Sequence, residues 1–402
     1  MIDEKLINEV ESELTEDFKA LEEIALFNEE KVLNAFKKNK IALRHFVGTS
    51  GYGYGDEGRD TLNRLFAGVF NAEAAICSPN IVSGTHALSL CLYGVLRPND
   101  TALSISGGVY DTLNDVIYGE NNGSLKDFGI KFDKVDLKNG DFDLPAIRQK
   151  LNELKPKMVY IQRSRGYEWR GALSIDKIEK AVKFLRDNGF DGCIMLDNCY
   201  GEFTEKREAT EIGVNLAAGS LIKNAGGGIA PTGGYVVGDK KYVDMVANRL
   251  TAPSIGGEVG SYAYGYQYFY QGLFLAPHTV LQALKGEMLF AVVLNKLGFK
   301  VSPAPHEFPH DIITMIEFGD KEKLISFIQS IQENSPVDSN VKVLPWEMPG
   351  YESPVIMAAG CFVQGASIEL SADAPVKPPY IAYLQGGITY EHCKIALKNL
   401  KI

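Results

Sequence analysis

Lys223 stands where an amine could do covalent chemistry. It comes directly after the apolar run 216–222 and shortly before three glycines at 226–228. This pattern places the amine at the end of a strand, beside exposed backbone. Burial there would lower the pKa of the amine toward a nucleophilic form. The plainer interpretation of this segment alone is a solvated loop lysine.

Asp197 ends a second apolar run, 193–196, and precedes Lys223 by 26 residues. A carboxylate at this place could pair with a ring nitrogen and keep it protonated, as an electron-accepting cofactor requires. A helix N-cap or a metal-binding carboxylate explains the same residue equally well. Asp197 is therefore informative only together with the other candidate residues.

Two further segments could bind other parts of a cofactor. Ser83, Gly84 and Thr85 open an apolar helical stretch, and the free N–H groups at a helix N-terminus can bind phosphate. A plain Ser/Thr helix cap is the commoner alternative. Tyr110 follows a strand-like run and two glycines, so its ring could stack on a flat cofactor or pack in the core.

Alternating strands and helices must position these residues. We expect helix over 3–40 and over 176–188, where Asp176 could cap the helix and Gly189 end it. Strand-like runs lie at 74–76, 101–105, 131–135, 158–161, 192–196, 216–221 and 234–237. Their alternation with helices predicts an α/β fold with a mostly parallel sheet, whose functional groups gather at the carboxyl ends of the strands.

The pattern changes toward the C-terminus. A helical segment from about Pro277 to Leu297 is followed by strand-like runs at 312–318, 355–358 and 366–370. We predict a helical segment at 1–47, a large domain at 48–275 that binds the cofactor, and a small α+β domain at 276–402.

The order of phosphate turn, tyrosine, aspartate and lysine resembles the fold-type I enzymes that use pyridoxal 5′-phosphate (PLP), with the aspartate aminotransferase-like fold. Within that group the chain is similar to the cystathionine and methionine lyases, specifically the lyase-like aluminium-resistance proteins. The specific motifs are Ser83–Ala87, Asp197-Asn198 and Ser220–Lys223, and the resemblance extends from about Tyr52 to the C-terminus.

The resemblance implies a role for each residue. Lys223, Asp197 and Tyr110 would be catalytic, as Schiff-base lysine, partner of the ring nitrogen and stacking ring. Gly84 and Thr85 with the Ser220 hydroxyl would hold the phosphate, next to Ser83.

Other positions are implied in the same way. Tyr54, in competition with Tyr52, and Arg59 would reach a neighbouring subunit's phosphate, although Asp56 occupies the place of the family's arginine. Gln162, Ser164 or Arg165 would face the cofactor. Gln385 stands where the lyases have an arginine for the substrate carboxylate.

The implied function is carbon–sulfur β- or γ-elimination on a small sulfur-containing amino acid, in a homodimer or homotetramer with its site at the subunit interface. An aminotransferase and a non-catalytic PLP-binding protein are the alternatives. The Ser220-x-x-Lys223 pattern of serine acyl-enzymes lacks its partner motifs, and there is no P-loop motif. Pro309 disfavours a helical metal pair of His306 and His310.

Composition sets the outer limits. A net charge of −10 and a pI of about 5.3 without a basic block argue against nucleic acid or an anionic membrane as partner. The six cysteines form no CxxC pair, which favours buried thiols in a reducing cytoplasm. No apolar run is long enough to cross a bilayer.

Overall fold

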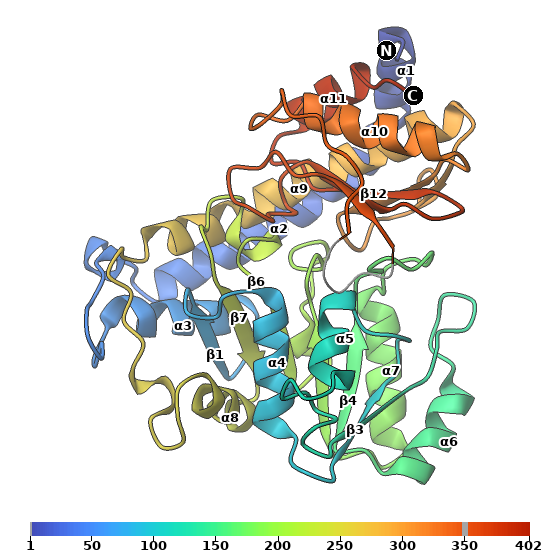
Figure 1. Ribbon diagram of the computed structural model, residues 1–402. Helices are drawn as coiled ribbons and strands as arrows, with labels where there is room; N and C mark the ends of the chain where they lie inside the picture. The colour runs from blue at the N-terminus through green and yellow to red at the C-terminus, as the bar shows by residue number, and fades with distance from the viewer. Residues whose placement is uncertain (1, 348–352) are drawn as a thin grey trace.

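A computed structural model describes residues 2–347 and 353–402. The larger lobe is built on a seven-stranded sheet with helices on both faces, and the smaller lobe contains a five-stranded sheet (Figure 1). Both chain ends lie in the smaller lobe. The predicted α/β class is confirmed. Within the described residues, no helix is long and apolar enough to span a membrane.

The large sheet has the strand order β1-β7-β6-β5-β4-β2-β3, and only β7 runs antiparallel to its neighbours. Gln162 pairs with Asp197 across β4 and β5, and Asp197 with Ala218 across β5 and β6. The carboxyl ends of these central strands therefore share one edge, as the sequence pattern predicts. The strands are β1 Ala74–Ser78, β2 Thr101–Ser104, β3 Lys131–Lys134, β4 Met158–Gln162, β5 Cys193–Asp197, β6 Leu216–Ser220 and β7 Gly234–Gly238.

Six α-helices, α3 to α8, alternate with or flank the strands of this sheet along the described chain. Helix α7 begins at Ile175 because the Ser174 side chain accepts a hydrogen bond from the Lys177 N–H at 3.2 Å. The expectation that Asp176 caps this helix was wrong, since the better-placed serine lies two residues earlier. The helices are α3 Glu57–Val69, α4 Gly84–Val95, α5 Asp111–Tyr118, α6 Leu144–Leu154, α7 Ile175–Asp187 and α8 Lys240–Leu250.

The expected helix over 3–40 forms two helices, α1 (Glu4–Glu13) and α2 (Thr15–Lys38). Helix α2 packs along α9 (Gln267–Lys296), which begins ten residues before the predicted start at Pro277. Pro277 lies inside α9, where tertiary packing overrides its helix-breaking tendency. A Cβ on Gly272 would lie 2.3 Å from the Gly226 carbonyl oxygen, so these glycines let α9 approach the loop that follows Lys223.

The small sheet is antiparallel in the order β10-β11-β12-β9-β8. The strand expected at 366–370 was wrong: this segment is a loop, and the strand begins at Ser371. Glu369 holds the loop by accepting hydrogen bonds from the N–H groups of Phe362 and Val363. The elements are β8 Lys300–Ser302, β9 Ile313–Glu317, β10 Val355–Ala358, β11 Ser371–Pro375, β12 Ile381–Gln385, α10 Lys321–Glu333 and α11 Tyr390–Lys398.

Candidate active site

An inner cavity of about 190 Å³ lies at the carboxyl edge of the large sheet. It joins the ends of β4, β5 and β6 to the beginnings of α4 and α5. Its lining includes eight of the ten residues expected at the site: Ser83, Gly84, Thr85, Tyr110, Ser164, Asp197, Ser220 and Lys223. Segments far apart in the sequence therefore meet at the edge predicted from the strand pattern.

Lys223 follows β6 and projects over Tyr200, with Nζ 4.0 Å from the ring centroid. Burial works against its charge, but the side chains of Cys199, Tyr200 and Asp197 outweigh it and raise the pKa of Lys223 above its ordinary value. The predicted lowering of this pKa was therefore wrong: burial does favour the neutral amine, but the neighbouring groups favour the ammonium more strongly.

Asp197 is 6% exposed at the end of β5. One carboxylate oxygen accepts a hydrogen bond from the Cys199 N–H at 3.1 Å, and the other lies 3.5 Å from the Tyr160 hydroxyl. Burial raises the pKa of Asp197, while the nearby Lys223 ammonium opposes the rise. A positively charged partner in the cavity would therefore strongly favour the carboxylate form.

Helix α4 begins at the wall of the inner cavity. The Ser83 hydroxyl caps it by accepting a hydrogen bond from the His86 N–H at 3.0 Å. The N–H groups of Gly84 and Thr85 lie in the first helical turn, where no intrahelical acceptor exists. A Cβ on Gly84 would lie 3.4 Å from the Ser220 Cβ, so helix start and strand end meet closely. This is a suitable cradle for an anion.

Tyr110 and Gln162 lie where the inner cavity opens outward. Gln162 is buried, and its side-chain nitrogen donates to the Ser164 carbonyl oxygen at 3.2 Å. Its Oε1 atom has no hydrogen-bond partner within the described structure. A buried acceptor in a cavity wall is a site for a ligand donor. Gly166, with φ +55°, keeps the backbone close to both side chains.

Arg165 does not face the inner cavity but ties it to the small lobe. Its guanidinium contacts Asp311 through Nε at 3.2 Å and Nη2 at 3.1 Å, and both side chains are buried. The Ser164 hydroxyl donates to the same carboxylate at 3.1 Å. Asp311 therefore fixes the cavity-lining segment after β4.

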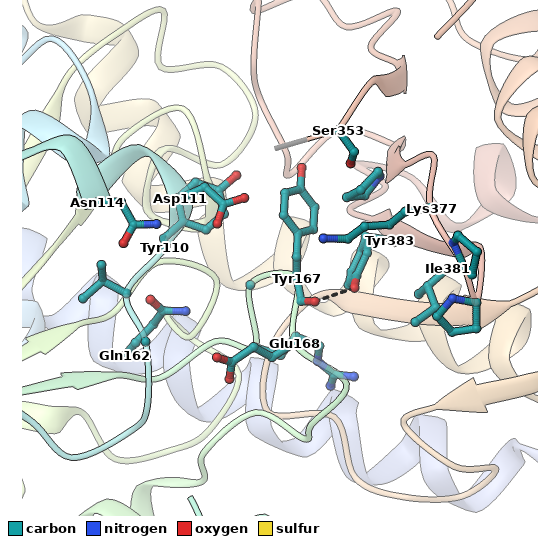
Figure 2. Close-up of a pocket in the computed structure, with 17 residues that line it drawn as sticks. Tyr110, Asp111, Asn114, Gln162, Tyr167, Glu168, Ser353, Lys377, Ile381 and Tyr383 are labelled. Carbon is teal, nitrogen blue, oxygen red and sulfur yellow. Dashed lines mark hydrogen bonds between the residues drawn. The ribbon is translucent and has the colours of Figure 1, made fainter. Parts of the chain in front are cut away.

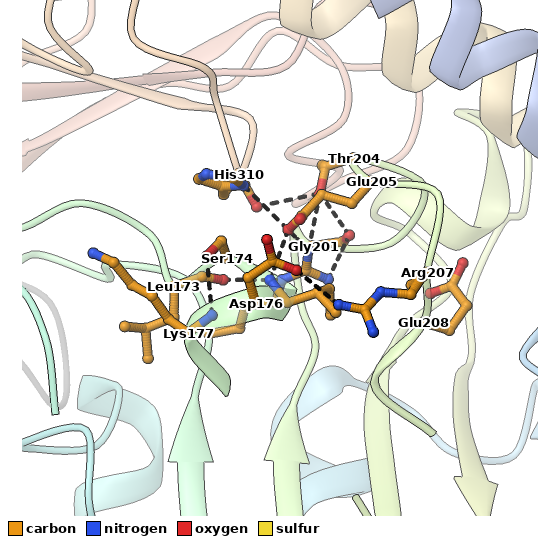
Figure 3. A network of polar contacts seen from close by, with 12 residues as sticks. Leu173, Ser174, Asp176, Lys177, Gly201, Thr204, Glu205, Arg207, Glu208 and His310 are labelled. Atoms are coloured by element: carbon orange, nitrogen blue, oxygen red, sulfur yellow. Dashed lines mark hydrogen bonds and ion pairs between the residues drawn. The ribbon is translucent and has the colours of Figure 1, made fainter. Parts of the chain in front are cut away.

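A second buried arginine anchors the turn after β5. Arg163 donates to the Gly201 carbonyl oxygen at 2.8 Å and to Glu205 at 2.8 Å. His310 Nδ1 lies 3.1 Å from the same Glu205 oxygen (Figure 3). Burial opposes the Glu205 charge, but the His310 contact and the Arg163 guanidinium hold the pKa of Glu205 at about 2. His310 is therefore paired with Glu205, whereas His306 is paired with Glu13 and Asp17. The two histidines thus contact different partners.

An outer chamber of about 390 Å³ continues from the inner cavity through Tyr110, Gln162 and Gly166. Tyr167 crosses it, with the Tyr383 hydroxyl donating to the Tyr167 carbonyl oxygen at 2.6 Å (Figure 2). The wall opposite the large lobe comes from the small lobe, and it includes Ser353, Pro375, Lys377, Pro378, Pro379, Ile381 and Tyr383.

Gln385 lines neither space. It is buried at the end of β12, and its Nε2 donates to an Asp373 oxygen at 3.2 Å. Burial raises the pKa of Asp373 to about 7. Gln385, which stands where a group for the substrate carboxylate was expected, is thus hydrogen-bonded to Asp373 instead.

The residues implied to reach a second subunit lie outside the inner cavity. Tyr54 is 68% and Tyr52 74% exposed, and their rings are 5.6 Å apart. Arg59 is buried and donates to the Gly53 carbonyl oxygen at 3.0 Å. Asp56, at the place of the family's arginine, caps α3 by accepting from the Arg59 N–H.

Among the cavity residues to which the sequence reasoning gave no role, Tyr200 and Cys199 are the two that lie beside both Asp197 and Lys223. Tyr200 has a left-handed φ of +70°, and its hydroxyl donates to Ser367 at 3.0 Å. Their only sequence signal is that they closely follow Asp197.

The inner cavity fits pyridoxal phosphate by its chemistry. It combines an amine, a buried carboxylate, an aromatic ring, a helix N-terminus and the unpaired Gln162 acceptor. The first four of these groups match, in that order, the aldehyde, ring nitrogen, ring face and phosphate of that cofactor.

Comparison with known proteins assigns the chain. The methionine gamma-lyase family model matches residues 3–401. Protein YnbB of Bacillus subtilis, itself uncharacterised, is 49% identical over 98% of this chain and 94% of its own. A carbon–sulfur lyase involved in aluminium resistance from Clostridium novyi is 49% identical, with a TM-score of 0.94 and coverage of 98% of this chain and 94% of that one.

A more distant structure shows how widely the fold occurs. The pyridoxal-5′-phosphate-dependent protein YhfS of Escherichia coli is 18% identical, with a TM-score of 0.65 over 94% of this chain and 95% of that one. The predicted fold-type I architecture is confirmed. The chain belongs to the methionine gamma-lyase family.

Proposed function

We propose that this protein is a PLP-dependent lyase that cleaves a carbon–sulfur bond of a sulfur-containing amino acid by β- or γ-elimination, through a Lys223 Schiff base. The observation that carries the proposal is that Lys223 and Asp197 face one cavity from the ends of neighbouring strands, opposite the start of α4. The family and the carbon–sulfur lyase similar to this chain support the same reaction class.

Different residues of the inner cavity would bind different parts of the cofactor. The N–H groups of Gly84 and Thr85 and the Ser220 hydroxyl would hold the phosphate, and Tyr110 would cover the ring. Asp197 would bind the ring nitrogen and keep its proton in place. Bound pyridoxal phosphate supplies an electron sink for the carbanion formed at the substrate's α carbon.

Lys223 would move the proton. Its Nζ lies beside Tyr200 in the wall of the inner cavity, where it would meet the substrate's α carbon. The amine would take the α-proton as a general base. In β-elimination the thiolate would then depart from Cβ, and in γ-elimination a proton would also leave Cβ before the thiolate departs from Cγ. Tyr200 would orient the amine, and the buried walls would limit the access of water.

The test is product analysis with L-cysteine conjugates, cystathionine and methionine. The proposal predicts ammonia, a keto acid and a free thiol in equal amounts. Amine transfer that requires an added keto acid would instead show an aminotransferase. Binding of these amino acids without any product would show a non-catalytic protein.

A further inference from the structure

Resting on the proposed function, we propose that Lys377 binds an anionic group at the far end of the substrate's side chain. The enzyme would then select sulfur amino acids whose sulfur substituent ends in a carboxylate over those with an uncharged alkyl substituent.

Within the described residues Lys377 makes no ion pair, whereas two other charged residues that line the outer chamber do. Arg165 is paired with Asp311, and Glu168 with Arg170 at 3.1 Å. Asp111 also has an interaction partner. The positive charge of Lys377 is thus available to a ligand, whereas that of Arg165 is neutralised inside the protein.

The position of Lys377 favours such a role. Its side chain extends from the small lobe toward Tyr167, with the amine end directed into the chamber (Figure 2). It comes from a turn in which Pro375, Pro378 and Pro379 restrict φ. The Tyr380 N–H donates to the Lys377 carbonyl oxygen at 2.8 Å, which closes the turn. The ammonium is therefore carried by a stiff support.

The inner cavity and the outer chamber would hold opposite ends of the substrate. The α carbon must lie near Lys223 in the inner cavity, because the proton is removed there. The side chain beyond the sulfur can then pass Tyr110 and Gly166, which line both spaces, into the outer chamber. Lys377 belongs only to the outer chamber. Lys377 would bind the anionic group at the end of the substrate's side chain, and other residues would bind the α-carboxylate.

Three matched compounds test this with the holoenzyme: S-(2-carboxyethyl)-L-cysteine, S-propyl-L-cysteine and S-(2-aminoethyl)-L-cysteine. Dissociation constants come from the change in cofactor absorbance on binding, and kcat and KM from keto-acid release. The wild-type protein should bind the carboxyethyl compound most tightly. Because an exposed charge pair is screened, added salt should weaken only that preference.

Lys377→Gln should raise the dissociation constant and KM of the carboxyethyl compound about 10-fold, or about 1.4 kcal/mol. Its kcat and the constants of the propyl compound should stay within about twofold, because uniform binding is lost without a change at the reacting atoms. Lys377→Arg should restore the preference. Lys342→Gln removes an exposed lysine of the same lobe outside the chamber and is the control.

An equal loss of affinity for the carboxyethyl and propyl compounds, or no loss for either, would overturn the assignment of Lys377. Failure of the proposed function would look different. In that case no compound would release keto acid, while the affinity for the carboxylate compound would still depend on Lys377.

Discussion

At the scale of single residues, a substitution of Asp197 should lower turnover without releasing the cofactor. Asp197→Asn keeps the size of the side chain but removes the charge that holds a proton on the ring nitrogen. We expect the cofactor to remain bound while turnover falls at least about 100-fold, a loss of about 2.7 kcal/mol of transition-state stabilisation. Steady-state kinetics with cofactor absorbance measure both effects. Turnover within about threefold of wild type would remove Asp197 from the mechanism.

We expect Glu202 to make the stability of the folded protein depend on pH. It is fully buried behind the site, and the Tyr235 hydroxyl donates to its Oε1 at 2.7 Å. Burial raises the pKa of Glu202 from 4.5 to about 8, although the Tyr235 contact opposes the rise. The folded protein therefore holds this proton more tightly than the unfolded chain. The resulting stabilisation is present at low pH and is lost as the pH rises through about 8.

Glu202→Gln should make the free energy of unfolding less dependent on pH in this range, because the amide does not titrate. Urea unfolding of both proteins at several pH values measures the difference. A wild-type curve and a variant curve that stay parallel from about pH 5 to about pH 8 would contradict the prediction.

Short-range patterns made much of the site predictable from the sequence. Lys223, Asp197 and Ser83 were identifiable because each follows an apolar run or opens an apolar helix. Tyr200 was not identifiable, since its place depends on a left-handed turn anchored by Arg163 and Asn224 from distant segments.

At the scale of elements, the Arg165–Asp311 pair joins the segment after β4 to the small lobe. Asp311→Asn leaves a buried guanidinium without its counter-charge, which costs about 3–5 kcal/mol in comparable buried pairs. We expect that loss in urea unfolding, together with weaker cofactor retention, because Ser164 loses its anchor.

The control for Asp311→Asn is Arg207→Gln, which breaks the exposed contacts of Arg207 with Asp176 and Glu179. Exposed pairs contribute about 0–1 kcal/mol. If the two variants lose equal stability, Asp311 does not act as the anchor described.

Element boundaries show the limits of local patterns. The central strands were predictable because buried parallel strands are continuous apolar runs. The start of α9 was not, because Pro277 signals a helix start. The helix nevertheless begins at Gln267, and at Gly272 this first part packs closely against Gly226 in the loop after Lys223. The segment 366–370 alternates apolar with polar residues like a strand but forms a loop, since Glu369 accepts hydrogen bonds from the N–H groups of Phe362 and Val363.

At the scale of the whole molecule, the exposed Tyr52 and Tyr54 favour a second subunit. The apolar residues Leu43, Val47 and Val82 are also exposed, and Val82 precedes Ser83 of the inner cavity in the chain. We propose a homodimer, or a homotetramer built from it, in which Tyr54 completes the partner's site. Closed symmetry would place two such sites in one interface.

Hybrid subunits test this arrangement. Lys223→Ala and Tyr54→Ala should each be nearly inactive alone. Mixed, unfolded and refolded together in equal amounts, they should recover about a quarter of wild-type activity, because half of the dimers hold one intact site. No recovery, with dimers present in sedimentation, would show that Tyr54 does not act across the interface.

The proposed attachment of the cofactor to Lys223 can be tested directly by one measurement. The protein is loaded with pyridoxal phosphate, reduced with borohydride, digested and analysed by mass spectrometry. If Lys223 carries the cofactor, the wild-type protein will contain one pyridoxyl-lysine, at Lys223, and Lys223→Ala treated in the same way will contain none. Labelling of another lysine in the wild-type protein, or undiminished labelling of the variant, would contradict it.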